Sequence, residues 1–144
     1  MKVYKLTEAY VQRNFDLPET KLKISLLDIR DPEKYPFLLI VQSTIEKSIK
    51  LSIYPLKNEK IVKVTFSDFN FSNEIFDEIS KILQNYQVIH TSGVLLIENQ
   101  LFYECYLNLS LGETKTNVLN VSLNKIKNIF KEIKIEEIGL KKAN

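Results

Sequence analysis

The chain has 144 residues, of which 44% are hydrophobic and 26% are charged, and its formal net charge is +2. This length fits one domain with an added segment. The near balance of charge and the presence of only two arginines argue against partners such as nucleic acid or an anionic membrane. No apolar run approaches the roughly 20 residues that span a bilayer. The start lacks the apolar core of a signal peptide and the single cysteine cannot form an internal disulfide, so we expect a cytoplasmic location.

Residues 1–58 are predicted to form a β-rich extension of about three strands that packs on a core domain of residues 59–144. The strands are expected at Lys21–Ile29, Phe37–Val41 and Ser48–Tyr54. The continuous apolar run Phe37–Val41 is typical of a strand that is buried on both faces. The first twenty residues carry no clear pattern.

The core domain begins with a predicted strand and helix. Ile61–Phe66 alternates, so that Val62, Val64 and Phe66 share one face. Ser72 is a suitable N-cap, and Phe71 and Phe76 stand at the two positions of a hydrophobic staple. The helical pattern runs from there to about Asn85.

Two further strands, a helix and a last strand follow. Gln87–Ile97 and Leu101–Leu111 read as a hairpin with the turn Glu98-Asn99-Gln100 between them. The second helix is expected at Asn117–Lys131 and the final strand at Lys134–Leu140. The order βαββαβ predicts an α+β fold, a ferredoxin-like sandwich with the N-terminal extension added, and right-handed crossovers favour the strand order 4-1-3-2 within its sheet.

The sheet face away from the helices is predicted to be partly apolar. Strict alternation places five large side chains on it, namely Val88, Val94, Leu96, Phe102 and Tyr106. Such a face is expected to be covered, either by the N-terminal strands or by a second subunit. Phe102 and Tyr106 are therefore candidate interface residues.

No catalytic or metal centre is predicted. His90 and Cys105 are the single histidine and cysteine, and neither a two-residue nor a three-residue turn in the hairpin brings them within hydrogen-bonding reach. The acidic clusters lack metal-ligand spacing. The three glycines are far apart, so a glycine-rich phosphate loop is excluded, and we expect no cofactor.

Two polar segments are candidate ligand contacts. The loop Ser67–Phe71 precedes a helix N-terminus, whose N–H groups favour carboxylates, and it contributes Asp68 and Asn70. The segment His90-Thr91-Ser92-Gly93 interrupts an apolar strand and contributes His90 and Ser92. The alternatives are an ordinary capped turn and a bend without a ligand.

The strand Ile61–Phe66, the Asp68 loop, the helix Asn73–Leu83 and Tyr86–His90 leading into a hairpin together resemble an ACT-like domain, over residues of about 60–140. The resemblance implies a small effector, such as an amino acid, bound in a homo-oligomer. Phe71 stands where that family has a glycine, and Asn70 replaces its usual proline. RNA-recognition domains share the topology, but Leu101–Asn108 lacks their basic-glycine-aromatic pattern.

The sequence thus predicts a non-enzymatic ACT-like regulatory module that binds a small effector of the amino-acid class as a homodimer or other homo-oligomer. The alternative is a protein–protein interaction or assembly module without a small ligand.

Overall fold

The computed structural model describes residues 9, 11, 24, 31–109 and 112–140. The chain forms two compact units, Met1–Arg30 and Asp31–Asn144, and the helices and strands described here belong to the second unit. The predicted strand Lys21–Ile29 lies outside the described residues except for Ile24.

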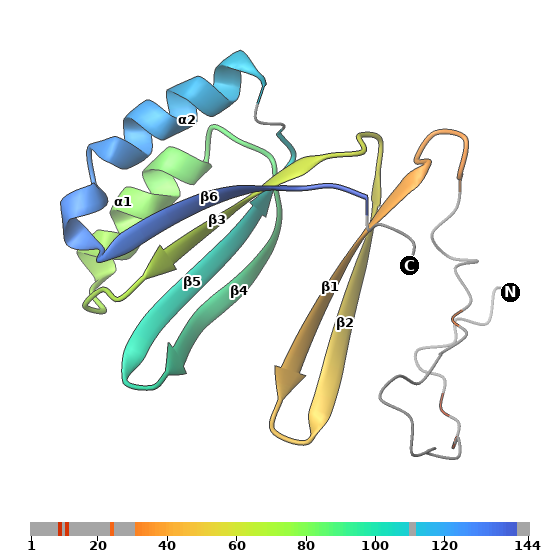
Figure 1. Ribbon diagram of the computed structural model, residues 1–144, viewed down its shortest axis with the longest axis horizontal. Helices are drawn as coiled ribbons and strands as arrows, with labels where there is room; N and C mark the ends of the chain where they lie inside the picture. The colour runs from red at the N-terminus through yellow and green to blue at the C-terminus, as the bar shows by residue number, and fades with distance from the viewer. Residues whose placement is uncertain (1–8, 10, 12–23, 25–30, 110–111, 141–144) are drawn as a thin grey trace, which may run out of the picture. The chain divides into compact units, whose positions relative to one another are not determined.

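The α+β class is confirmed, because the described residues form two antiparallel sheets and two α-helices. The elements in chain order are β1 Phe37–Ile45, β2 Ser48–Leu56, β3 Ile61–Ser67, α1 Asn73–Leu83, β4 Val88–Ile97, β5 Gln100–Leu107, α2 Thr114–Asn124 and β6 Glu132–Ile138. A 3₁₀ turn, Lys127–Ile129, separates α2 from β6. Strands β1 and β2 form a hairpin, and the larger sheet has the order β4-β5-β3-β6 (Figure 1). This is the strand order that the sequence pattern predicts.

The main core lies between the four-stranded sheet and the helices. Both helices cover the same side of this sheet (Figure 1). The buried cluster joins β3 to both helices through Val62, Val64, Phe66, Ile79, Leu83, Leu119 and Leu123. Because β3 is paired on both edges, its side chains on this face are removed from water most completely.

The first helix begins where its capping residues predict. Ser72 has an extended backbone, and its Oγ accepts a hydrogen bond from the N–H of Ile75 at 3.2 Å. The rings of Phe71 and Phe76 lie 5.2 Å apart, as a hydrophobic staple requires. The helix ends at Leu83, two residues before the predicted end.

We expect Ser72→Ala to lower the free energy of unfolding by about 1 kcal/mol, because the substitution removes the side-chain acceptor for the first turn of α1. Urea denaturation measures the loss. Ser80→Ala, at an exposed position of the same helix, is the matched control and should cost little, since alanine favours a helix interior. Equal losses in the two variants would contradict the capping role.

The second helix differs from its prediction. It starts at Thr114 rather than Asn117, and its α-helical part ends at Asn124 rather than Lys131. Asparagine is a poor residue for a helix interior, and the 3₁₀ turn that follows still places Ile126 and Phe130 in the core. Ile126 and Phe130 therefore belong to the core although the α-helix ends before them.

The hairpin β1–β2 packs against the opposite face of the larger sheet. A second buried cluster contains Leu39, Val41 and Leu56 of the hairpin and Ile61 of β3, with Ile89, Tyr106 and Ile138 packed around it. Leu38 and Ile40 are 41% and 58% exposed. The prediction that Phe37–Val41 is buried on both faces is therefore wrong, because a two-stranded hairpin covers the sheet with one face only.

We call the face of the larger sheet that lies away from the helices its open face. Val88, Val94 and Leu96 are predicted to lie on the open face, but they lie on the face that the helices cover. The turn between β4 and β5 contains two residues, Glu98 and Asn99, both with left-handed backbone, so Ile97 pairs with Gln100. This register places Val94 opposite Tyr103 and Leu96 opposite Leu101, on the helix side. Two further register shifts place Val88 opposite Leu107, also on that side.

Candidate functional site

The Asp68 loop is a packed connection. Asp68 has a left-handed backbone, its N–H donates to the carbonyl of Leu101 at 2.8 Å, and its own carbonyl accepts from the N–H of Lys131. Phe69 is buried, with its ring 5.2 Å from that of Phe130. Asn70 is exposed. The backbone groups of this loop therefore serve the fold.

The pocket beside the start of α1 is acidic. Its lining includes the carboxylates of Glu74, Asp77 and Glu78 together with Lys81. Three carboxylates and one ammonium group disfavour an anionic ligand at this place, although the positive end of the helix dipole is near.

The structure does not bring the four predicted ligand residues together. Ser67, which precedes Asp68, pairs with Phe102, whereas His90 pairs with Tyr106 at the other end of β5. Four residues along a strand correspond to roughly 13 Å at ~3.3 Å per residue. Asp68 and Asn70 therefore lie at one end of the sheet, and His90 and Ser92 lie toward the other.

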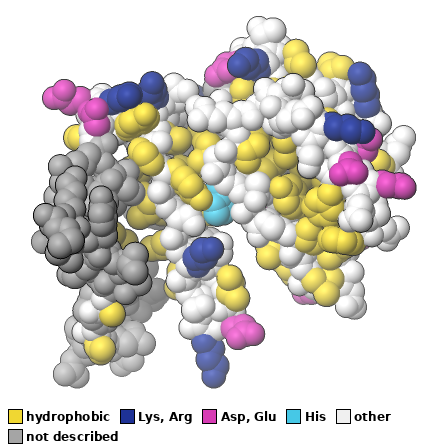
Figure 2. All heavy atoms as spheres, turned by 180° about the vertical axis from the view of Figure 1, so that it is seen from behind, with side chains coloured by type: hydrophobic (Ala, Val, Ile, Leu, Met, Phe, Trp, Pro, Cys, Tyr) yellow, Lys and Arg dark blue, Asp and Glu magenta, His cyan; other side chains and the backbone are white. Residues whose placement is uncertain are grey.

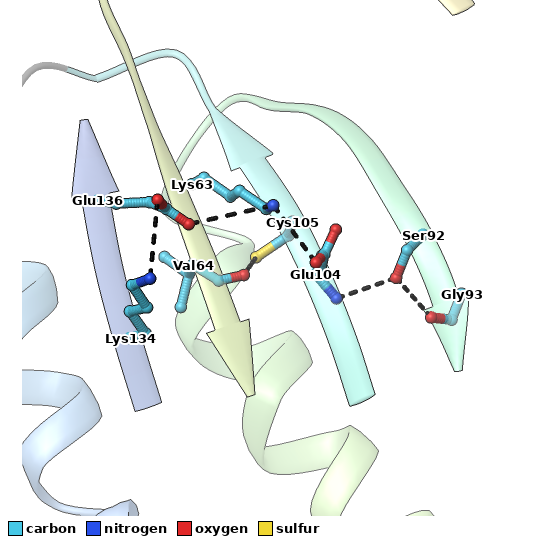
Figure 3. Close-up of polar contacts among 8 residues, drawn as sticks. All are labelled: Lys63, Val64, Ser92, Gly93, Glu104, Cys105, Lys134 and Glu136. Atoms are coloured by element: carbon cyan, nitrogen blue, oxygen red, sulfur yellow. Dashed lines mark hydrogen bonds and ion pairs between the residues drawn. The ribbon is translucent and has the colours of Figure 1, made fainter. Parts of the chain in front are cut away.

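Ser92 supports a bulge in the edge strand β4. Its Oγ accepts a hydrogen bond from the N–H of Glu104 at 3.0 Å and donates to the carbonyl of Gly93 at 2.7 Å (Figure 3). Gly93 has a positive φ of 69°, which glycine adopts without strain. The polar break in this strand therefore satisfies the backbone where the register shifts.

His90 and Cys105 point to opposite faces of the sheet, whereas the sequence predicts only that they lie out of hydrogen-bonding reach and leaves their faces open. Thr91 pairs with Cys105 while His90 pairs with Tyr106, so the two side chains lie on different sides of the sheet. Cys105 is fully buried, and burial raises the pKa of its thiol to about 12. A thiolate nucleophile with His90 as its base is therefore excluded.

His90 instead joins the hairpin to the sheet. Its Nδ1 lies 2.6 Å from the hydroxyl of Tyr54 on β2, and its ring makes edge contacts with the rings of Tyr54 and Tyr106. When Tyr54 donates, Nδ1 is the acceptor and the imidazole proton lies on Nε2. Figure 2 shows the histidine at the surface with hydrophobic side chains on either side.

A pocket of about 560 Å³ lies beside this contact, and we call it the junction pocket. Its walls come from the hairpin and from the ends of β4 and β5: Tyr35, Tyr54, Pro55, Leu56, Lys57, Gln87, Val88, Ile89 and Asn108. This volume is in the range of small-molecule sites.

Side-chain amides beside the junction pocket form a hydrogen-bonded chain. Asn58 donates to Asn108 Oδ1 at 3.3 Å, and Asn108 Nδ2 donates to Gln87 Oε1 at 2.9 Å. Gln87 Nε2 is thus the donor at the end of this amide chain. The Lys57 ammonium lies 5.7 Å from the centre of the Tyr35 ring, within the range of a cation–π contact.

A row of charges crosses the open face next to His90. Lys63 Nζ lies 3.3 Å from Glu104 and 4.0 Å from Glu136, and Lys134 also contacts Glu136 (Figure 3). Burial by itself lowers the pKa of Lys63, but the interactions of its ammonium group with Tyr106 and Glu104 raise that pKa by more. The pKa of Lys63 is therefore raised. Tyr106 and Phe102 are half-buried on this face, so its centre is polar and aromatic rather than purely apolar.

Neither a metal site nor a membrane span is found in the described part of the chain. Its His, Cys, Asp and Glu side chains form no group of three that suits a metal ion. Among the described residues no helix is long and apolar enough to cross a membrane.

No family model matches the chain, and no curated protein is significantly similar to it. The fold and the junction pocket therefore carry the functional argument.

Proposed function

We propose that the chain is a non-enzymatic regulatory module with a ferredoxin-like, ACT-like scaffold, which acts in the cytoplasm as a homo-oligomer. Its effector is an amino acid or a similar small carboxylate metabolite. The observation that supports this proposal is the junction pocket, which combines a lysine, an amide chain and two tyrosine rings.

The lining residues match the chemistry of such a ligand. The Lys57 ammonium and the Gln87 amide supply donors for a carboxylate, and hydrogen bonds to charged groups are the stronger ones. The rings of Tyr35 and Tyr54 offer apolar surface for the remainder of the molecule. This placement replaces the Asp68 loop as the effector site and retains His90 as the residue that positions Tyr54.

A regulatory role is supported by the origin of the pocket walls. Tyr54 and Lys57 belong to the hairpin and its continuation, whereas Gln87 and Asn108 adjoin the strands of the larger sheet. A ligand that contacts both sides favours the arrangement in which the two sheets are close, and it shifts the population toward that arrangement.

The test is a thermal-shift screen of the purified protein against amino acids and small carboxylates. A ligand that binds the folded state at 100 times its dissociation constant adds ~2.7 kcal/mol of stability. For a ligand found in this way, we expect Lys57→Ala and Gln87→Ala each to weaken binding roughly 10- to 100-fold in calorimetric titration, because each removes a hydrogen bond to a charged group.

Asp68→Ala and Asn70→Ala are the controls, since both residues lie at the other end of the sheet. If these two variants weaken binding and the junction variants do not, the effector site is the Asp68 loop. A screen without any ligand would instead favour the second candidate, an assembly module without a small ligand, for which the apolar residues Leu95–Ile97 on edge strand β4 provide a surface.

A further inference from the structure

The two edges of the larger sheet differ in charge. Edge strand β6 has the sequence Glu-Ile-Lys-Ile-Glu-Glu-Ile, in which four of the seven residues are charged. Edge strand β4 spans Val88–Ile97 without an aspartate, glutamate, lysine, arginine or proline. Charges and prolines are the usual devices that prevent an edge strand from pairing with another chain. Strand β6 has such protection along its length, and β4 does not.

The protection that β4 does have covers only its first half. Both register shifts lie before Val94, and bulges twist an edge away from potential partners. From Val94 to Ile97 each residue pairs regularly with β5. Since ladder hydrogen bonds alternate in direction, every second residue of this segment presents its N–H and C=O groups to the free edge.

The side chains of the same segment are apolar and exposed. Leu95, Leu96 and Ile97 are 40%, 69% and 52% exposed, respectively. When another strand pairs alongside these three aliphatic residues, part of their apolar surface is removed from water, which favours the pairing. The exposed groups thus include both the backbone ladder and the hydrophobic surface of a strand-pairing interface.

We propose that Leu95–Ile97 pairs antiparallel with the same segment of a second copy of this chain, with Leu96 at the two-fold axis. The inference rests on the proposed homo-oligomer and specifies its interface. A neutral strand can pair with itself in any register without opposing like charges, whereas self-pairing of β6 centred on Glu136 or Glu137 would oppose two glutamates.

The register follows from the faces of the strand. Leu95 pairs with Phe102 and so lies on the open face, and Ile97 shares that face by alternation. Centring the pair on Leu96 places Leu95 opposite Ile97 of the second copy on the open side. It also places the two Leu96 side chains opposite each other on the helix side. The helices of both copies then cover the same side of one continuous eight-stranded sheet.

Sedimentation velocity over a range of concentrations tests the pairing. We expect a dimer for the unaltered chain, and Leu96→Lys and Leu96→Glu should each raise the dimer dissociation constant about tenfold or more, because like charges meet at the axis. An equimolar mixture of the two variants should again form dimers, since lysine then faces glutamate. Ile40→Lys, at a position of the hairpin that is also exposed (58%, against 69% for Leu96), is the matched control and should leave the dimer intact.

A second measurement does not depend on introduced charge. Residues opposite each other in an antiparallel pair have Cα atoms about 4.5–5.5 Å apart, a separation that a disulfide spans. Leu96→Cys in a Cys105→Ala background should therefore form a linked dimer on mild oxidation, and Ile40→Cys in that background should not.

The outcomes separate the inference from the function on which it rests. A chain that is monomeric at all concentrations would remove both the homo-oligomer and its interface. A dimer that survives both Leu96 charge variants, or that Ile40→Lys dissociates instead, would overturn the β4 interface and leave the homo-oligomer standing.

Discussion

Phe66→Ala should lower the free energy of unfolding by about 3–5 kcal/mol, the range found when a large side chain is removed from a packed core. Phe66 is fully buried on β3, and its ring lies 5.0 Å from that of Phe130 and 6.1 Å from that of Tyr103. Tyr103 belongs to β5 and Phe130 to the segment after α2, so the two rings are held by different elements and cannot both move into the space that is left. Urea denaturation, with the slope unchanged and the midpoint lowered, measures the effect.

Phe71→Ala is the matched control for this prediction. Phe71 is 64% exposed and contacts Phe76 in the staple at the start of α1, so its removal should cost no more than about 1 kcal/mol. Losses of similar size for the two variants would contradict the placement of Phe66 at the centre of the core. A reversed order would indicate that the loop before α1 carries more of the stability than the sheet does.

The sequence predicts the centre of the core well because its signals are local. In β3 the alternation of Val62, Val64 and Phe66 determines the buried face, and all three are fully buried. In α1 the cap at Ser72 and the staple fix the first turn. Each of these signals depends on residues within about five positions of one another, so no knowledge of the tertiary fold is needed.

The faces of β4 could not be predicted in the same way. Counting Gln100 as part of the turn, rather than as the first residue of β5, shifts the pairing by one position and transfers Val94 and Leu96 to the wrong face. A two-residue turn requires left-handed backbone at both Glu98 and Asn99. Glutamate gives little indication of that conformation in the sequence.

The candidate site is less visible still, because its contacts are distant in the chain. Tyr54 meets His90 across 36 positions, and Asn58 meets Asn108 across 50. In the sequence His90 stands out as a polar residue in an apolar strand, but no comparable signal marks Tyr54, Lys57, Gln87 or Asn108. Alternation in the hairpin would place Tyr54 on the same face as Leu56, toward the sheet, and this is the one sequence signal that leads to the junction pocket.

The stability that Cys105 contributes should disappear in alkali. Burial raises the pKa of its thiol to about 12 from an ordinary 9.0. A raised pKa means that the folded chain keeps a proton that the unfolded chain loses, so the contribution is complete below pH 9 and declines as the pH rises toward 12. Because a tenfold change in an ionisation equilibrium corresponds to about 1.4 kcal/mol, the decline should be on the order of 3 kcal/mol by pH 11.

The measurement compares the unaltered chain with Cys105→Ala from pH 7 to 11, because the difference between them contains the ionisation of the thiol and its effect on the neighbouring Tyr103. The pKa values of Tyr103 and Lys63 are also raised, so both chains lose stability in alkali for these reasons as well. We expect the stability difference to be constant up to about pH 8.5 and then to shrink. A difference that stays constant to pH 11 would mean that the thiol ionises equally in the folded and unfolded chain, which is incompatible with a Cys105 side chain enclosed between the four-stranded sheet and the helices.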